Sequence, residues 1–387
     1  MGNTAIVKPP RRLRAGIVGG GRGAFIGSVH RMAAELDGQA RVVAGALSSD
    51  PRIARESAAA WLLERAYTSY LEMASSEGAR RDDGIDFVII ATPNDLHCPV
   101  ARAFLEAGIH VVCDKPLALT VAEGEELVRL VEAGPTLFAL THAYTGYPAV
   151  RQAREMVSAG ELGEIRKVMV EYTQDWLMEA VETRGNKQAA WRTDPARAGL
   201  AGCVGDIGTH CANLVEFVTG RRIEALCAEL STFVPGRRLD DDASILLRLE
   251  GGAKGTLSCS QVACGEENRL SIRLYGSRAG LEWHQEEPNT LIHKPAGKPW
   301  ARLRTGHGYL SASAQALTRV PAGHPEGYLE AFANIYRRFI EDVRRVQLGQ
   351  APVHDYPGVR DGLRGLRFVA QAVESSRAGS VWLRSAS

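Results

Sequence analysis

The chain has 387 residues, of which 45% are apolar, and its formal net charge at pH 7 is +1. This length allows two domains with separate cores, and the balanced charge gives no electrostatic basis for binding nucleic acid. No apolar run reaches the ~20 residues of a membrane helix, and residues 1–14 contain no apolar core of a signal peptide. Seven cysteines without a C-x-x-C pair indicate a reducing compartment. We therefore expect a cytoplasmic protein that binds neither nucleic acid nor a membrane.

The segment 16-GIVGGGRGAFIGSVH-30 follows an apolar, strand-like run that ends at Val18. A strand, a glycine-rich turn and a helix in this order predict a phosphate-binding turn, because glycines let the backbone approach a pyrophosphate and the first helix amides bind it. The third small residue of the pattern is either Ala24 or, if residues 23–25 are an insertion, Gly27; we favour the insertion. The expected cofactor contacts in this turn are Gly19, Gly21, Arg22, Gly23, Ala24, Phe25 and Ile26.

Strand-like and helical segments alternate up to residue 141. Thr120 and Glu123 have the capping-box spacing that begins a helix. The alternation predicts a doubly wound parallel sheet, and we place a dinucleotide-binding domain at residues 1–142. Its strands are predicted near residues 13–18, 41–47, 85–91, 109–113 and 136–141.

The end of the second predicted strand bears on the choice of dinucleotide. An acidic residue at this place normally binds the ribose hydroxyls of NAD, whereas here Ser48 occupies it, followed by Ser49 and Asp50. Arg52 or Arg55 could bind the extra phosphate of NADP, but neither arginine immediately follows the strand. We therefore favour NAD and leave NADP open.

Another strand-like run ends in 113-CDKP-116. Ligands of parallel α/β sheets lie beyond the carboxyl ends of the strands, so we expect Lys115 to point into the cofactor crevice. The alternative is an ordinary solvated lysine after a strand. The peptide bond between Lys115 and Pro116 is a candidate for the cis form, which would fix the direction of the lysine.

The segment 205-GDIGTH-210 begins an apolar stripe with helical period. Asp206 and His210 are four residues apart, so on an α-helix their Cβ atoms lie about 5–6 Å apart on one face. The carboxylate could then orient the imidazole and raise its basicity, as a general base for alcohol oxidation requires. The alternative is that Asp206 caps the helix and His210 is a packed surface histidine.

Residues 143–387 predict a different architecture, a second α/β domain with a large, open, mostly antiparallel sheet. The exposed face of that sheet suits a homodimer or a homotetramer. Residues 295–325 have no clear period, and we expect them to help close the active site. The C-terminal helix is a candidate to pack back on the first domain. The predicted helices are 148–159, 326–348 and 356–376, and the predicted strands are 165–172, 242–250, 254–263, 268–275 and 280–284.

Together these segments resemble the Gfo/Idh/MocA oxidoreductases. The resemblance implies a Rossmann domain followed by an α/β domain, an NAD(P) cofactor and a carbohydrate substrate. The family's catalytic positions fall on Lys115, Asp206 and His210, and Asp114 stands where glutamate is commoner. Its nicotinamide-side loop falls on Thr92, Pro93, Asn94 and His97. The resemblance is carried by 19-GGGRG-23 with His30, 91-ATPNDLH-97, 113-CDKP-116, 148-PAVRQAREMVSAGELGEI-165 and 205-GDIGTH-210.

Three further segments are similar to the levoglucosan dehydrogenase and glucoside 3-dehydrogenase branch of this family. They are 187-KQAAWRTDPARAG-199, 261-QVACGEENRLSIRLYG-276 and 323-GHPEGYLEAFANIY-336. The similarity implies a pyranose substrate held by aromatic faces and polar edges. Two of the candidates, Trp176 and Tyr144, could equally be core aromatics. Substrate contacts are expected from Lys115, Tyr144, Trp176, Trp191, Arg192, Asp206, His210 and His324.

The resemblance predicts oxidation of a secondary alcohol, at C3 of a sugar or anhydrosugar, with either His210 or Lys115 as the immediate base. An inositol or aldose dehydrogenase, a keto-sugar reductase, and an NAD-dependent glycosidase without net redox change remain alternatives. A dinucleotide sensor without chemistry is disfavoured because Lys115, Asp206 and His210 are all present. The histidines and cysteines have no zinc spacing, so we expect no metal.

Overall fold

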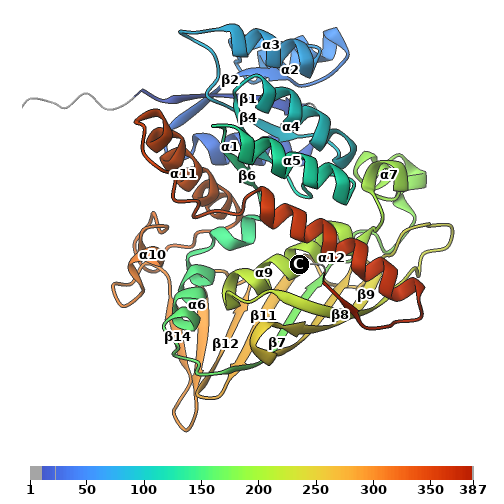
Figure 1. The fold of residues 1–387 in the computed structure, drawn as a ribbon, viewed down its shortest axis with the longest axis vertical. Helices are drawn as coiled ribbons and strands as arrows, with labels where there is room; N and C mark the ends of the chain where they lie inside the picture. The colour runs from blue at the N-terminus through green and yellow to red at the C-terminus, as the bar shows by residue number, and fades with distance from the viewer. Residues whose placement is uncertain (1–10, 22, 386–387) are drawn as a thin grey trace, which may run out of the picture.

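Two sheets organise the chain, a smaller parallel sheet and a larger mixed sheet (Figure 1). The computed structural model describes residues 11–21 and 23–385. Within these residues, no helix is both long enough and apolar enough to cross a membrane.

The first sheet has six parallel strands in the order β3-β2-β1-β4-β5-β6. This order reverses direction between β1 and β4, which creates the crevice where doubly wound sheets bind dinucleotides. The five strands expected from the sequence are confirmed, and the two-residue strand β3 is added at the edge. The strands are β1 Leu13–Gly19, β2 Ala40–Ala46, β3 Arg65–Ala66, β4 Phe87–Ala91, β5 His110–Cys113 and β6 Phe138–Leu140.

Helices cover both faces of this sheet, and local sequence signals determine where several of them begin. The side chain of Asp50 accepts hydrogen bonds from two backbone amides and caps α2. Thr120 and Glu123 form the predicted capping box of α5. Because each cap satisfies amides that have no helical partner, it fixes the first turn of its helix. The helices are α1 Phe25–Glu35, α2 Pro51–Ala60, α3 Tyr70–Ala79, α4 His97–Glu106 and α5 Val121–Ala133.

The second sheet has nine strands in the order β14-β13-β12-β11-β7-β10-β9-β8-β15. All neighbouring pairs are antiparallel except β7 and β10. Strand β9 alternates between buried and exposed residues, as expected for a sheet covered on one face only. The strands are β7 Ile165–Thr173, β8 Ile223–Ser231, β9 Asp242–Leu249, β10 Lys254–Ser260, β11 Arg269–Gly276, β12 Ala279–His284, β13 Thr290–Pro295, β14 Ala301–Arg304 and β15 Leu383–Arg384.

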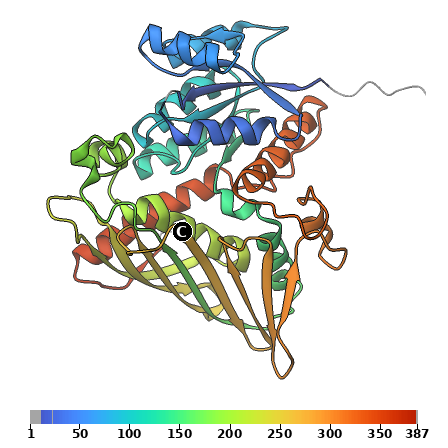
Figure 2. The same ribbon diagram turned by 180° about the vertical axis from the view of Figure 1, so that it is seen from behind.

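Helices α6 Pro148–Ser158, α9 Thr209–Thr219 and α12 Val359–Arg377 lie across one face of the second sheet. Figure 2 shows the other face, across which no helix of the described chain lies. The large open sheet expected from the sequence is therefore present.

The C-terminal part of the chain packs against both sheets. Helix α11 Tyr328–Gln347 places Phe332, Tyr336 and Phe339 in one core with Phe87 of β4. The next helix, α12, contributes Leu366 to the core of the first sheet. It also contributes Phe368 to the core of the second sheet. The two sheets are thus joined by apolar burial that no short sequence segment contains.

Residues 295–325 have more structure than the sequence indicated, because they contain β14 and the short helix α10 Ala312–Gln315. The amide of Ser311 donates to Gln152 of α6 at 2.8 Å, and Arg319 pairs with Asp37 at 2.7 Å. These contacts hold the segment against α6 and against the turn after α1, so its expected role in closing the site stays a prediction.

Candidate functional site

The glycine-rich turn after β1 has the backbone conformation that a phosphate-binding turn needs. Gly19 and Gly20 have φ angles of +79° and +71°, which favour glycine. A Cβ atom on Gly27 would lie 2.3 Å from the Cα atom of Gly20, so Gly27 is the glycine at the close contact between α1 and the turn. This geometry agrees with an insertion at residues 23–25. The sequence interpretation had not singled out Gly20.

Helix α1 begins at Phe25 after Ala24, and no side chain of residues 11–21 or 23–385 caps its first amides. Uncapped amides at the amino end of a helix are suited to bind an anion such as a pyrophosphate. Gly23 and Phe25 are exposed in this turn, and Ala24 and Ile26 are partly buried. The predicted contact Arg22 lies outside the described residues.

The turn after β2 contains the residues expected to bind the adenine ribose. The hydroxyl of Ser48 accepts a hydrogen bond from the amide of Asp50 at 3.1 Å, and Ser49 is exposed. The carboxylate of Asp50 is occupied in capping α2. Arg52, a candidate phosphate partner for NADP, is paired with Glu56 at 2.8 Å. The serine hydroxyls are therefore the groups best placed to meet a ribose.

The loop after β4 lies at the same end of the sheet. The hydroxyl of Thr92 is buried and has no hydrogen-bond partner within the described residues, as expected of a group that meets a ligand. Pro93 precedes the short helix η1 Asn94–Leu96, and the side-chain Nδ2 of Asn94 donates to the carbonyl of Ala198 at 3.1 Å. This bond links the loop to α8 Pro195–Ala198, in the second half of the chain.

His97 supports this loop from behind. Its Nδ1 atom lies 2.6 Å from the carbonyl oxygen of Pro116, and its Nε2 atom lies 3.0 Å from that of Thr92. The ring is fully buried, and this burial lowers its pKa. A neutral imidazole has one N–H, so His97 donates to one of these two carbonyl oxygens and lies against the other. It thus lies between the Thr92 loop and the Lys115 loop, and a direct contact with the cofactor stays a prediction.

Asp114 fixes the start of the Lys115 loop. Its Oδ1 atom accepts hydrogen bonds from the amide of Lys115 and from the hydroxyl of Thr141, both at 2.9 Å. Burial raises the pKa of Asp114, but the nearby His30 and Lys115 outweigh burial and leave it below its ordinary value. The carboxylate therefore stays ionised and anchors the loop, and the peptide bond between Lys115 and Pro116 is cis, as expected.

Lys115 points from the first sheet into the second half of the chain. Its Nζ atom donates to the Oδ1 atom of Asp206 at 2.6 Å and to the carbonyl oxygen of Asp206 at 2.7 Å. The two side chains are 14% and 17% exposed, so the ion pair is largely withdrawn from solvent. The sequence had not indicated this contact between Lys115 and Asp206, and the alternative of an ordinary solvated lysine is wrong.

Asp206 lies in the short π-helix η4 Val204–Gly208. Its Oδ2 atom accepts hydrogen bonds from Gln261 at 2.9 Å and from Arg192 at 3.3 Å. Burial by itself would raise the pKa of Asp206. The positive charges of Lys115 and Arg192 lower it by a larger amount, so the pKa lies below its ordinary value. The carboxylate therefore stays ionised at neutral pH.

The expected bond between Asp206 and His210 is wrong. Both carboxylate oxygens are used by other residues, and the Nδ1 atom of His210 lies 3.5 Å from the Nδ1 atom of His142 instead. The physical reason is the wider π-turn, in which positions four apart no longer stack as they do on an α-helix. The capping alternative is wrong too, because Asp206 lies inside η4 and α9 follows Gly208.

His210 is buried rather than on the surface. Burial lowers its pKa well below the ordinary value, the charge of Lys115 and the neighbouring His142 lower it further, and Asp206 opposes this effect. The imidazole is therefore neutral at neutral pH. A neutral imidazole can accept a proton, which fits a general base.

The predicted substrate contacts divide into three groups. Tyr144 is buried beside His210, with ring centroids 4.8 Å apart. The guanidinium of Arg192 lies 4.1 Å from the ring centroid of Trp191 and 5.8 Å from that of Trp176. The same guanidinium also donates to the Asp206 carboxylate at 3.3 Å. His324, in contrast, is exposed and interacts with its own turn through the carbonyl of Pro321 at 3.1 Å.

The sequence interpretation missed a group of polar residues that line the same place. Tyr172 is hydrogen-bonded to Tyr144 and donates to Asn268 at 2.7 Å. Gln174 also donates to Asn268 at 2.7 Å. The available sequence signal was weak: Gln261 and Asn268 lie in the segment 261–276 that resembles the levoglucosan branch, whereas Tyr172 and Gln174, at the end of β7, lie in no such segment. The missed residues are His142, Tyr172, Gln174, Gln261 and Asn268.

Two family models match the chain. The model described as an oxidoreductase family with an NAD-binding Rossmann fold matches residues 13–142, and the model described as the GFO/IDH/MocA C-terminal domain matches residues 150–282. The chain belongs to the Gfo/Idh/MocA family. This family member is an NAD-dependent dehydrogenase, and its glycine turn, uncapped α1 and unpartnered Thr92 hydroxyl fit a bound NAD.

Individual relatives agree with the family assignment. The uncharacterized oxidoreductase YfiI of Bacillus subtilis is 35% identical over 99% of this chain and 98% of its own. An inositol dehydrogenase homolog from Azotobacter vinelandii, complexed with NAD+, is 39% identical, with a TM-score of 0.93 and 97% of each chain covered. The same homolog complexed with NADH and myo-inositol is 38% identical. Levoglucosan dehydrogenase complexed with NADH and levoglucosan is 26% identical, with a TM-score of 0.84, and 97% of this chain and 100% of that chain are covered.

Proposed function

We propose that this protein oxidises one secondary ring hydroxyl of a carbohydrate, with Lys115, Asp206 and His210 as its catalytic residues. The observation that carries the proposal is the meeting of a buried Lys115–Asp206 ion pair, with a 2.6 Å contact, and a buried neutral histidine at the mouth of the dinucleotide crevice. In the mechanism, NAD supplies the hydride acceptor at C4 of its nicotinamide.

Each half of this arrangement has a separate task. The ammonium group of Lys115 donates a hydrogen bond to the substrate oxygen and stabilises the negative charge that develops as the O–H bond breaks. Asp206 holds that ammonium in place through its 2.6 Å contact. His210 accepts the hydroxyl proton, because burial keeps its ring neutral.

The first substrate candidate is an anhydrosugar or glucoside such as levoglucosan, oxidised at C3. Support comes from the aromatic faces of Trp176 and Trp191, the guanidinium of Arg192 and the polar group around Asn268. Aromatic faces and multidentate polar groups are suited to the C–H faces and hydroxyl edges of a pyranose. The levoglucosan complex shares the fold over nearly the whole chain.

A cyclic polyol such as myo-inositol is the second candidate. It is favoured by the greater similarity to the inositol dehydrogenase homolog, at 38% identity against 26% for the levoglucosan complex. Both candidates present secondary hydroxyls on a six-membered ring, so the same catalytic residues serve either.

The deciding experiment measures NADH formation by the purified protein with levoglucosan, methyl glucosides, free aldoses and myo-inositol, with NADP run in parallel. Reduction of NAD with levoglucosan or glucosides alone supports the first candidate, and reduction with myo-inositol alone supports the second. Release of free aglycone without NADH would indicate the NAD-dependent glycosidase instead. No turnover with any compound, despite NAD binding, would reject the proposed function and favour a sensor.

We further propose that residues 1–142 form the dinucleotide-binding domain, that residues 143–387 form the substrate domain, and that the open sheet makes a homodimer or homotetramer. Exposed apolar side chains on or beside that face include Leu246 and Phe233, which are 48% and 66% exposed. Light scattering tests this surface, because Leu246→Lys would shift the mass towards the monomer. An unchanged mass would reject it. The cytoplasmic location stays a prediction.

A further inference from the structure

Two buried histidines meet behind the proposed reacting centre. The Nδ1 atoms of His142 and His210 are 3.5 Å apart, and their rings are nearly perpendicular, at 87°. The rings are 2% and 8% exposed. His142 follows β6 of the first sheet, whereas His210 lies on α9 over the second sheet. The contact therefore joins the two halves of the molecule at the site.

The carboxylate of Asp206 cannot take a proton from His210 along a direct hydrogen bond. Its two oxygens accept from Lys115, Arg192 and Gln261. Within residues 11–21 and 23–385, the side chain of His210 is hydrogen-bonded to the side chain of His142. A base that has accepted a proton must release it before the next turnover. His142 is placed to receive it.

We infer that His142 is a proton-relay residue that accepts, from Nδ1 of His210, the proton that leaves the substrate. The inference rests on the proposed function, in which His210 is the base. The substrate O–H bond breaks and an N–H bond forms at Nε2 of His210. The N–H bond at Nδ1 of His210 then breaks as one forms at Nδ1 of His142, and His210 is again neutral. Bound NAD would accept the hydride, and the proton leaves from Nε2 of His142. Rotation of the two imidazole rings then restores the starting tautomers, so that Nε2 of His210 can accept the next proton.

Helix α12 closes over both histidine-bearing segments and brings a negative charge near the relay. A Cβ atom on Gly362 would lie 2.8 Å from Leu140, and one on Gly365 would lie 2.9 Å from Thr209, so glycines permit this close packing. The amide of Leu140 also donates to the carbonyl of Pro357 at 2.8 Å. Asp361 lies on the first turn of the same helix.

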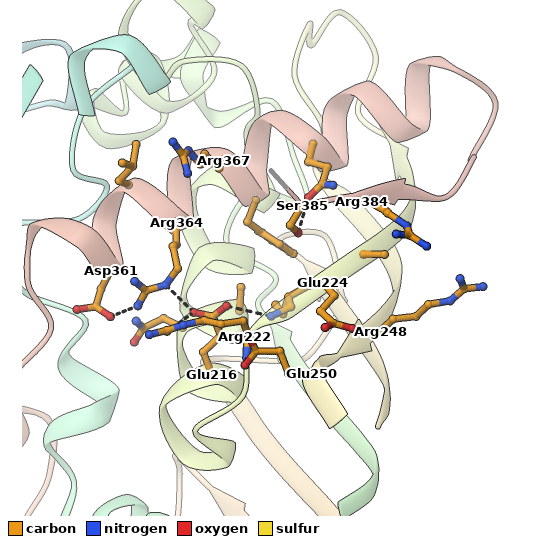
Figure 3. A pocket seen from close by; sticks show the side chains of 18 of the residues that line it. Glu216, Arg222, Glu224, Arg248, Glu250, Asp361, Arg364, Arg367, Arg384 and Ser385 are labelled. Atoms are coloured by element: carbon orange, nitrogen blue, oxygen red, sulfur yellow. Dashed lines mark hydrogen bonds and ion pairs between the residues drawn. The ribbon is translucent and has the colours of Figure 1, made fainter. Parts of the chain in front are cut away.

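Asp361 lines a cavity of about 780 Å³ between α9, α12 and β8. Figure 3 shows Asp361 at one end of this cavity, bonded to Arg364, which also contacts Glu216. This cavity contains none of the predicted cofactor or substrate residues. Asp361 acts electrostatically on His142 and also lines this cavity, so the released proton is assigned an exit on this side of the relay.

The charges around His142 suit a transient proton carrier. Burial lowers the pKa of His142 to about 4, Lys115 and Arg364 lower it, and Asp361 and Asp114 raise it. The ring is therefore neutral and ready to accept at neutral pH. The carboxylate of Asp361 stabilises the positive charge while the proton passes.

The test compares His142→Asn with the unchanged holoenzyme, using NAD and the best substrate of the panel. Asparagine keeps a polar side chain but cannot take a proton at one atom and release it at another. We expect kcat to fall about 10-fold or more, KM to change less than about twofold, and the solvent deuterium isotope effect on kcat to rise. His110→Asn, which removes a histidine at the start of β5, is the control and should leave all three unchanged.

A wild-type kcat with an unchanged isotope effect in His142→Asn would overturn the relay, and so would a raised KM with a normal kcat. Should His142→Asn fail to fold, Asp361→Asn decides, because asparagine can still accept the amide of Gly358. A lower kcat with a larger isotope effect supports the relay, and an unchanged kcat rejects it. His210→Ala separates the two levels: a near-normal rate there rejects His210 as the base of the proposed function, whereas a strong loss there with a fully active His142→Asn rejects the relay alone.

Discussion

The candidate site has two halves that neutralise their polar groups in different ways. In the ionic half, Lys115 and Arg192 are paired with the carboxylate of Asp206. In the neutral half, His210 packs against Tyr144 and Tyr172, His142 packs against His210, and burial lowers the pKa of both histidine rings. The ionic half therefore holds charged side chains in fixed positions, and the neutral half holds an uncharged proton acceptor.

The difference follows from what each half must do during alcohol oxidation. A fixed cation lowers the energy of a developing alkoxide without having to move, since its orientation is set beforehand. A proton acceptor must begin uncharged, and a dry pocket that penalises charge keeps it so. Four predictions test this division of labour.

The largest effect is expected from His210→Ala. Removing the proton acceptor should lower kcat by about 10²–10⁴-fold, while NAD binding, followed by quenching of protein fluorescence, stays unchanged. Stopped-flow NADH absorbance measures the rate. A variant with a near-normal rate would show that the proton goes elsewhere, with Lys115 as the first alternative.

Lys115→Met should cost about 10²–10³-fold in kcat, the loss typical of removing one preorganised donor from a developing oxyanion. Asp206 keeps its contacts with Arg192 and Gln261 in this variant, so the fold should persist. Circular dichroism and the melting temperature serve as controls. If kcat were retained and only KM rose, the lysine would bind the substrate without acting on its reaction.

The pH dependence of kcat/KM distinguishes the halves without deleting a group. A protonated His210 cannot accept a proton, and its pKa lies well below 6.5, so the acid limb of oxidation should fall below pH 6.5. The rate then drops about 10-fold per pH unit below that lowered pKa. Asp206→Asn removes a charge that raises this pKa and should move the limb to still lower pH. An acid limb at or above pH 6.5 would contradict the neutral half.

The smallest effect is expected from Arg192→Lys at the rim of the ionic half. The guanidinium lies over Trp191 and contacts Asp206, and a lysine cannot reproduce both contacts. KM should rise about tenfold or less, with kcat within about threefold, because the loss falls on binding rather than on the reacting atoms. Steady-state kinetics measures both constants. A selective loss of kcat would move Arg192 into the catalytic group.

Local sequence signals predicted the first sheet well. The order of strand, glycine turn and helix, the capping box at Thr120 and the lysine after β5 each depend on a few neighbouring residues. Even the displaced helix glycine, Gly27, could be inferred, because a helix that crosses a glycine turn needs a small residue where the backbones approach.

The wrong or missing predictions concern residues whose contacts are made with distant parts of the chain. The i, i+4 spacing of Asp206 and His210 predicted a hydrogen-bonded pair. Asp206 instead lies in a π-turn, and its carboxylate is hydrogen-bonded to Lys115. His324 matched a segment of the related branch but faces solvent in its own turn. His142 carried no motif at all, because its role depends on a contact with a residue 68 positions away.

The sequence by itself determined the Rossmann half, the open second sheet and the family, and it singled out Lys115, Asp206 and His210 as candidates, since periodicity, turn chemistry and motif spacing act over short stretches of chain. Only the tertiary structure decided which of those residues touch. Lys115 is 91 residues from Asp206, and the partner of each group is chosen by burial, which makes an unpaired charge costly and forces the best available pairing across domains. That choice separates the ionic half from the neutral half.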